Sequence, residues 1–159
     1  MLTDSAIALP RPTQARTFTG LMTLYESNFL RLAWLLPNMK DIPEQQVSRP
    51  AGDLPLFLTV RELGRYTTTL HLTYMFMDGT EPVADPDLSV RIYHDARLVE
   101  TMDCSTFHRH RVLEPFTTAP GKDLHHRWQR NMLLNKWLEY CADAGHLFSE
   151  APTCQASRA

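Results

Sequence analysis

The stretch LFLTVRELGRYTTTLHLTYMF, residues 56–76, decides the fold. Apolar and polar residues alternate on both sides of Gly64, which is the period of β-strands with one buried face. A three-residue loop, 63–65, sets Leu56, Leu58 and Val60 opposite Leu72, Leu70 and Thr68. A two-residue loop would instead oppose that apolar row to threonines and His71. Because burial specifies register, we expect a hairpin with the three-residue loop.

A second hairpin is predicted farther along the chain. Its strands are residues 88–93 and 98–102, and its turn is residues 94–97. A loop of even length sets Arg91 opposite Glu100 and Tyr93 opposite Leu98. A three-residue loop would place Glu100 in an apolar row with His94, as an acid–base pair in a dry site. An unpaired buried carboxylate is costly, so we favour the even loop.

Two helices are expected at the ends of the folded part. Residues 19–36 carry apolar side chains at three- and four-residue steps, with Thr19 as the N-cap and Pro37 as the stop. Residues 123–144 carry a second apolar stripe, and Gly145 follows as the C-cap. That stripe consists of Leu134, Trp137, Leu138 and Cys141.

The remaining segments are expected to connect these elements. Residues 38–55 and 79–87 contain prolines and glycines and are interpreted as connections, and 107–113 as a weak fifth strand. The fold class is therefore α+β, an antiparallel sheet of two hairpins with four or five strands and both helices on one face. We expect one domain over 18–148 between flexible tails at 1–17 and 149–159.

Composition narrows the class of protein. The 159 residues include sixteen basic and eighteen acidic side chains, a net charge of −2, which argues against a dedicated nucleic-acid binder. Cys104, Cys141 and Cys154 include no CxxC pair, so we expect reduced thiols in the cytoplasm. No signal peptide and no apolar run long enough to span a membrane is present. Neither glycine-rich phosphate loop nor catalytic motif occurs, and no cofactor is expected.

Candidate ligand-binding residues lie at the hairpins. Arg65 and Tyr66 precede three threonines, a combination of guanidinium and hydroxyl groups that suits an anion or a nucleotide phosphate. His94 and Asp95 offer an imidazole and a carboxylate, although an Asp in a turn usually caps its own backbone. The full predicted set is Arg65, Tyr66, Arg91, Tyr93, His94 and Asp95.

Two further motifs suggest other chemistry. His108 and His110 share a strand face and could bind one metal ion, but no third ligand is evident, so no metal is predicted. Trp128 lies among His125, His126, Arg127 and Arg130. That mixture would suit RNA or an acidic partner, although a solvated helix face is the commoner reading.

Four motifs in this order resemble the YqiB-like family of uncharacterised proteobacterial proteins. They are LMTLYESNF at 21–29, RYTT at 65–68, VRIYHDA at 90–96 and WLEYC at 137–141. The resemblance covers about 21–145 and implies a bacterial cytoplasmic protein. It implies no activity, cofactor or catalytic residue.

The residues leave three hypotheses for function. The first is a non-catalytic binding or adaptor domain that recognises a small anion or a protein partner through its sheet. The second is a small hydrolase that uses His94 with Asp95, or a metal at His108 and His110. The third is a weak RNA binder that uses the last helix.

Overall fold

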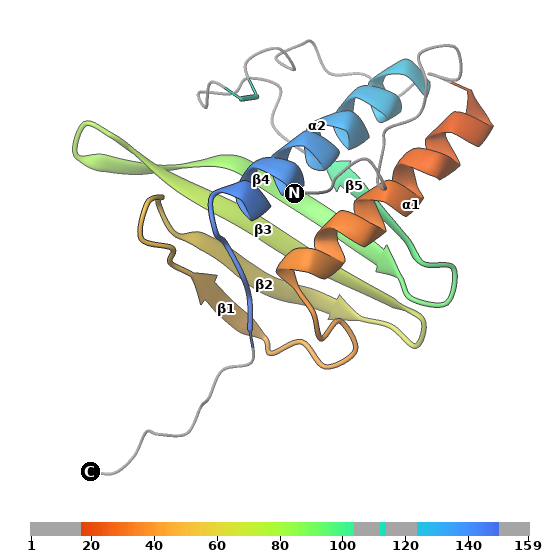
Figure 1. Cartoon of the computed structure of the whole chain (residues 1–159), viewed down its shortest axis with the longest axis horizontal. Helices are drawn as coiled ribbons and strands as arrows, with labels where there is room; N and C mark the ends of the chain where they lie inside the picture. The colour runs from red at the N-terminus through yellow and green to blue at the C-terminus, as the bar shows by residue number, and fades with distance from the viewer. Residues whose placement is uncertain (1–16, 104–111, 114–123, 150–159) are drawn as a thin grey trace.

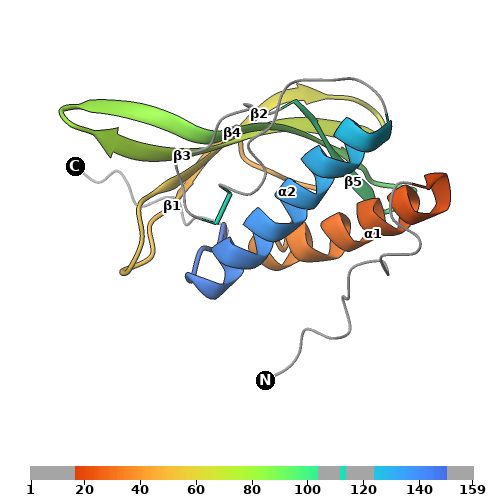
Figure 2. The same cartoon turned by 90° about the horizontal axis from the view of Figure 1, so that it is seen from above.

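The computed structural model describes residues 17–103, 112–113 and 124–149, which form two layers (Figure 1). One layer is an antiparallel sheet with strand order β1-β2-β3-β4-β5. Both helices lie side by side on one face of it and run in the same direction (Figure 2). The elements are α1 (Phe18–Leu35), β1 (Gln45–Ser48), β2 (Leu56–Leu63), β3 (Thr67–Asp78), β4 (Glu81–Tyr93), β5 (Leu98–Asp103) and α2 (Leu124–Asp143). The predicted α+β class and the placement of the helices are confirmed.

The helix ends show how local sequence sets the elements. α1 begins after Thr17, whose hydroxyl accepts the N–H of Gly20 at 2.9 Å, so the prediction of Thr19 as N-cap was wrong by two residues. α2 ends at Asp143, and the predicted C-cap glycine, Gly145, follows with a φ of 93°. The N–H of His146 donates to the carbonyl of Cys141 at 3.0 Å and that of Gly145 to Ala142 at 3.1 Å. These two bonds form a Schellman motif, which needs a left-handed residue at this point.

The core lies between the helices and the sheet. Trp137 is fully buried, as the sequence predicted, and Tyr74 packs edge-on against its ring at a centroid distance of 5.0 Å. Fully buried leucines from every layer surround it, among them Leu32, Leu35, Leu58, Leu70, Leu72, Leu88, Leu134 and Leu138. Burial of each such side chain contributes about 1.5–3 kcal/mol to the free energy of unfolding. The apolar packing between the helices and the sheet therefore holds the two layers together.

Three buried asparagines join both helices to the edge strand β5. Asn28 of α1 donates to the carbonyl of Val99 and to Asn131 of α2, each at 3.3 Å. The side-chain oxygen of Asn131 also accepts the backbone N–H of Thr101 at 2.9 Å. Asn135 donates to Asn28 at 3.0 Å. Because all three side chains are at most 1% exposed, these bonds satisfy polar groups that water does not reach.

The first hairpin is present, but its predicted register was wrong by two residues. Leu58 pairs with Leu72 rather than Leu70, and a β-bulge interrupts the ladder between Val60 and Glu62. A shift of two preserves the side-chain faces, so the apolar row still points at the helices. The bulge then places Arg61 and Glu62 next to each other on the opposite face, where regular alternation would separate them.

Two predicted connections contain strands. Residues 45–48 form β1 and pair with β2, although Val47 is their only apolar residue. Residues 81–87 form the first half of β4 and pair with β3, so one continuous meander replaces the two separate hairpins. Pro82 and Pro86 argued against a strand there. They are tolerated because β5 ends opposite Ser89, so that no described strand pairs with the other edge of that half of β4. The fifth strand predicted at 107–113 falls mostly outside the described residues.

The second hairpin has the favoured register. Tyr93 pairs with Leu98 and Arg91 with Glu100, as the even loop predicts. His94 contacts Thr68, which is 4% exposed and faces the helices. Glu100 instead bonds to Tyr93 on the other face, so no acid–base pair of His94 with Glu100 forms.

The predictions of reduced cysteines and of no membrane span can be compared with the described residues only. Cys141 is a free, buried thiol whose pKa is raised by burial, in agreement with the predicted reduced state. Cys104 and Cys154 lie outside the described residues. Neither described helix is both long and apolar enough to cross a membrane.

The asparagine network predicts an effect of Asn131→Ala. This change leaves the buried N–H of Thr101 without its acceptor, so the free energy of unfolding should fall by about 1–3 kcal/mol. Urea denaturation measures it. Lys136→Ala, an exposed change on the same helix, is the control and should cost less than about 0.5 kcal/mol. Equal losses in the two variants would show that the network does not hold the layers.

Candidate functional site

The face of the sheet away from the helices is lined by polar side chains. Alternate residues of β2 to β5 point to it, and the register sets them in rows across the strands. One row contains Thr59, His71 and Ser89, and the next contains Glu62, Thr69, Arg91 and Glu100. We call this surface the uncovered face, because no described helix packs on it (Figure 2).

Arg61, His71 and Asp87 form a chain of contacts across three strands of the uncovered face. Nε and Nη2 of Arg61 lie 3.3 and 3.1 Å from Nδ1 of His71. Arginine only donates, so Nδ1 is the acceptor and Nε2 carries the hydrogen. Nε2 lies 3.3 Å from Oδ1 of Asp87, which also accepts the hydroxyl of Thr73 at 3.0 Å. The carboxylate therefore orients the imidazole, and the imidazole holds the guanidinium in place.

Arg91 and Tyr93 lie farther along the same face. Nε of Arg91 donates to the hydroxyl of Thr69 at 3.2 Å, and its guanidinium lies 3.9 Å from the carboxylate of Glu62. The hydroxyl of Tyr93 donates to Glu100 at 2.9 Å. Burial and this bond to Glu100 raise the pKa of Tyr93, so its hydroxyl stays protonated. Both predicted residues are thus half-buried members of a hydrogen-bonded surface.

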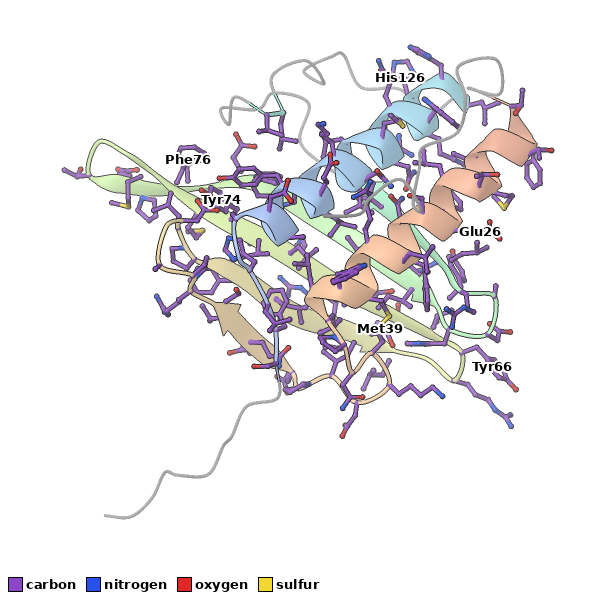
Figure 3. The ribbon with its side chains drawn as sticks, viewed as in Figure 1. Glu26, Met39, Tyr66, Tyr74, Phe76 and His126 are labelled. Atoms are coloured by element: carbon purple, nitrogen blue, oxygen red, sulfur yellow. The ribbon has the colours of Figure 1, made fainter. Side chains whose placement is uncertain are left out.

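The other four predicted residues gather at one end of the sheet, where two turns meet. The backbone N–H of His94 donates to the carbonyl of Tyr66 at 3.0 Å and ties the turns together. The guanidinium of Arg65 lies 5.3 Å from the centre of the Tyr66 ring, and Tyr66 is 54% exposed. Figure 3 shows Tyr66 at this end, opposite the end where Tyr74 lies. We call this group the turn cluster: Arg65, Tyr66, His94 and Asp95.

Within the turn cluster, the imidazole and the carboxylate do not act on each other through a hydrogen bond. Nε2 of His94 lies 2.8 Å from the hydroxyl of Thr68. Asp95 accepts the N–H of Ala96 at 3.0 Å and so caps its own turn, as expected for an Asp there. Burial lowers the pKa of His94, and the positive charge of Lys40 lowers it further.

A second group of titratable residues, which the sequence did not single out, is buried near the far end of the sheet. Nδ1 of His146 lies 3.0 Å from Oγ of Ser48, and Nε2 lies 3.0 Å from Oδ2 of Asp53. Tyr74 donates to Asp53 at 2.6 Å (its ring is labelled in Figure 3). Burial raises the pKa of Asp53, but the bonds from Tyr74, the backbone of Leu54 and His146 outweigh this effect and lower it.

This serine–histidine–aspartate group resembles a catalytic triad in its contacts but not in its setting. The side chain of His146 is fully buried, that of Asp53 is 7% exposed, and Ser48 is 4% exposed. The oxygen of Ser48 also accepts the backbone N–H of Leu147 at 3.0 Å. A nucleophile must reach its substrate, whereas Ser48 is enclosed and occupied. The group instead fastens the segment after α2 to β1 and to the loop before β2.

Other sequence predictions fall elsewhere. Trp128 is 8% exposed and packs with Leu21, Leu24 and Tyr25, so the interpretation of its surroundings as a solvated helix face was wrong for this ring. Helical spacing places Trp128 on the inner side of α2, and tertiary packing overrides the charge of its neighbours. His108 and His110 lie outside the described residues. Among the residues the structure describes, no group of three or more metal-ligating side chains occurs.

The sequence did not point to Arg61, His71 and Asp87 as a group. Two signals were present, because His71 alternates with the buried leucines of β3, and Asp87 precedes Leu88 by one residue. Combining them required the pairing of β3 with the first half of β4, which the prolines concealed. Arg61 joins the group only because of the bulge in β2, which the sequence does not mark.

The fold and the polar uncovered face place the chain in the class of small α+β domains with an antiparallel sheet. The family within this class has no assigned activity. Residues 31–147 match the family described as "protein of unknown function (DUF1249)", and the chain belongs to this family. It is 33% identical over 135 residues to the uncharacterized protein YqiB of Escherichia coli K12, which covers 80% of this chain and 90% of that protein. YqiB of E. coli O157:H7 shows the same identity and coverage. The family resemblance found in the sequence is confirmed, and no solved structure matches the chain.

His94 predicts a difference in how stability depends on pH. Its folded-state pKa is lowered, so below the ordinary histidine value of about 6.5 the unfolded chain binds a proton that the folded chain resists. Stability is therefore lost as pH falls from 7 to 5. Urea unfolding at both pH values should show a smaller loss in His94→Gln than in the wild type. Identical losses would mean that the histidine is not held neutral in the fold.

Proposed function

We propose that the protein is a non-catalytic binding domain that holds a small oxyanion, such as a phosphate or carboxylate group, on its uncovered face. The observation that carries this proposal is the position of Arg61. Its guanidinium donates to a ring nitrogen of His71 and, among the described residues, has no carboxylate within 4.0 Å. An oxyanion is a better acceptor for a guanidinium than an imidazole nitrogen is. Hydrogen bonds to an oxyanion are charge-assisted, and two parallel N–H groups of the guanidinium can bind two of its oxygens at once.

The surroundings of Arg61 supply further donors for such a ligand. Asp87 lies beside Nε2 of His71 and holds the ring with Nδ1 toward Arg61, so the guanidinium is fixed in place on this face. The hydroxyl of Thr59 is in the same row as His71. Arg91 is in the neighbouring row, although Glu62 offsets part of its charge. The anion therefore meets a set of donors that three strands hold in place.

A catalytic role finds less support in the described residues. The hydrolase hypothesis needs His94 and Asp95 to cooperate, but each bonds to a different group at the turn. The serine–histidine–aspartate group is enclosed. The sequence predicts the four residues of the turn cluster as ligand contacts too, and binding by variants of Arg61 and Arg65 separates that cluster from the uncovered face.

Binding of inorganic phosphate and pyrophosphate should depend on Arg61. In calorimetric titrations at low salt, Arg61→Gln should bind pyrophosphate about ten-fold more weakly or worse, since a hydrogen bond to a charged group contributes about 1.5–3 kcal/mol. The control is Arg65→Gln, an exposed arginine of the turn cluster, which should bind like the wild type. Loss of binding in Arg65→Gln alone would assign the anion to the turn cluster. A wild-type protein that shows no saturable binding would refute the proposal.

A further inference from the structure

The uncovered face also contains an aromatic ring in line with Arg61. Phe57 lies four residues before Arg61 on β2 and points to the same face, with Thr59 between them. The guanidinium of Arg49 lies over the Phe57 ring at 6.0 Å from its centre. We call these four residues, Arg49, Phe57, Thr59 and Arg61, the β2 strip.

The β2 strip is positively charged at both ends. Among the described residues, neither Arg49 nor Arg61 has a carboxylate within 4.0 Å, whereas Arg91 on the neighbouring row has Glu62 at 3.9 Å. Two guanidinium groups that have no ion-pair partner in the described part of the chain therefore flank one half-buried phenyl ring. This combination is complementary to a ligand that is both planar and anionic.

The spacing along the strand fits such a ligand. Four residues of an extended strand cover about 13 Å, which is comparable to an extended nucleoside diphosphate from its base to its last phosphate. The guanidinium of Arg49, a flat and delocalised group, already lies over one side of the Phe57 ring. A nucleobase is such a group, and stacking on an aromatic side chain is tolerant of base identity.

We infer that the anion bound by the uncovered face is a nucleotide, whose base stacks on Phe57 and whose phosphates bind Arg61. In this arrangement Arg49 leaves the phenyl ring and covers the other side of the base. The inference rests on the proposed function, because the phosphates occupy the anion site described above. It adds a second contact, at Phe57, that inorganic phosphate cannot use.

ADP and pyrophosphate separate the two contacts. Calorimetric titration of the wild type should show ADP binding about five-fold more tightly than pyrophosphate or better, because one stacked base contributes about that factor. Phe57→Val keeps a residue suited to a strand and should abolish the advantage of ADP while pyrophosphate binding stays unchanged. Tyr66→Val removes another ring that an arginine covers, at the turn cluster, and should keep the full advantage.

Other results of these titrations would contradict the nucleotide inference. If ADP binds no more tightly than pyrophosphate, the nucleotide inference is wrong and the oxyanion site stands. If the advantage of ADP is lost in Tyr66→Val but not in Phe57→Val, the base lies at the turn cluster and the inference is also wrong. Binding of a single-stranded oligonucleotide far above that of ADP would assign the face to RNA instead. If neither small ligand binds, the oxyanion site and the inference fail together.

Discussion

The hydrogen bonds of Asn28 and Asn131 to strand β5 are the interaction on which the two-layer arrangement depends. β5 is an edge strand, and its carbonyl at Val99 and N–H at Thr101 both bond to helix side chains. Apolar packing alone would hold the helices against the sheet without fixing how far along it they sit. Directional bonds at buried positions do fix that position, because any displacement leaves polar groups without partners. The same bonds keep both helices on one face, so the other face remains open for polar side chains.

The alternation of residues 56–76 was enough to predict the class of fold and the faces of the first hairpin. It was not enough for the register, because a shift by two residues conserves every face and only tertiary packing chooses between the two pairings. The even loop at 94–97 was predictable, since one alternative would bury Glu100. β1 and the first half of β4 were missed for a common reason. Their own residues carry weak strand signals, and the neighbouring strand supplies the pairing that defines them.

In the candidate site, too, some positions were predictable from the sequence and others depend on tertiary structure. Arg91 and Tyr93 could be placed on one face from their period, and the turn cluster forms because alternate turns of a meander, here β2–β3 and β4–β5, lie at the same end of the sheet. The position of Arg61 beside His71 depends on a bulge. A bulge redirects a side chain at the cost of one regular pair, and such irregularities are common near binding and active sites. In this chain it places two consecutive charged residues on the face that the helices leave open.

The contrast between the two histidine–aspartate groups bears on function. His146 and Asp53 are enclosed by Ser48, Tyr74 and the chain after α2, and every polar contact there is satisfied from within the protein. His71 and Asp87 are more exposed, with side-chain exposures of 27% and 43%, and they meet an arginine that has no acidic partner among the described residues. The first arrangement stabilises the fold, whereas the second has donors available to a ligand. A binding surface is therefore located by where polar groups remain incompletely paired.

The most direct test of this account is a map of backbone amide chemical shifts during a titration with pyrophosphate. The account predicts that the largest changes lie on β2 and β3, at Thr59, Arg61 and Glu62 and at the facing residues His71 and Thr73. Amides of α1 and α2 should change little, because the helices cover the other face. Changes confined to the two turns that carry Arg65 and His94, or no saturable change in any described segment, would contradict the claim that the uncovered face is the binding surface.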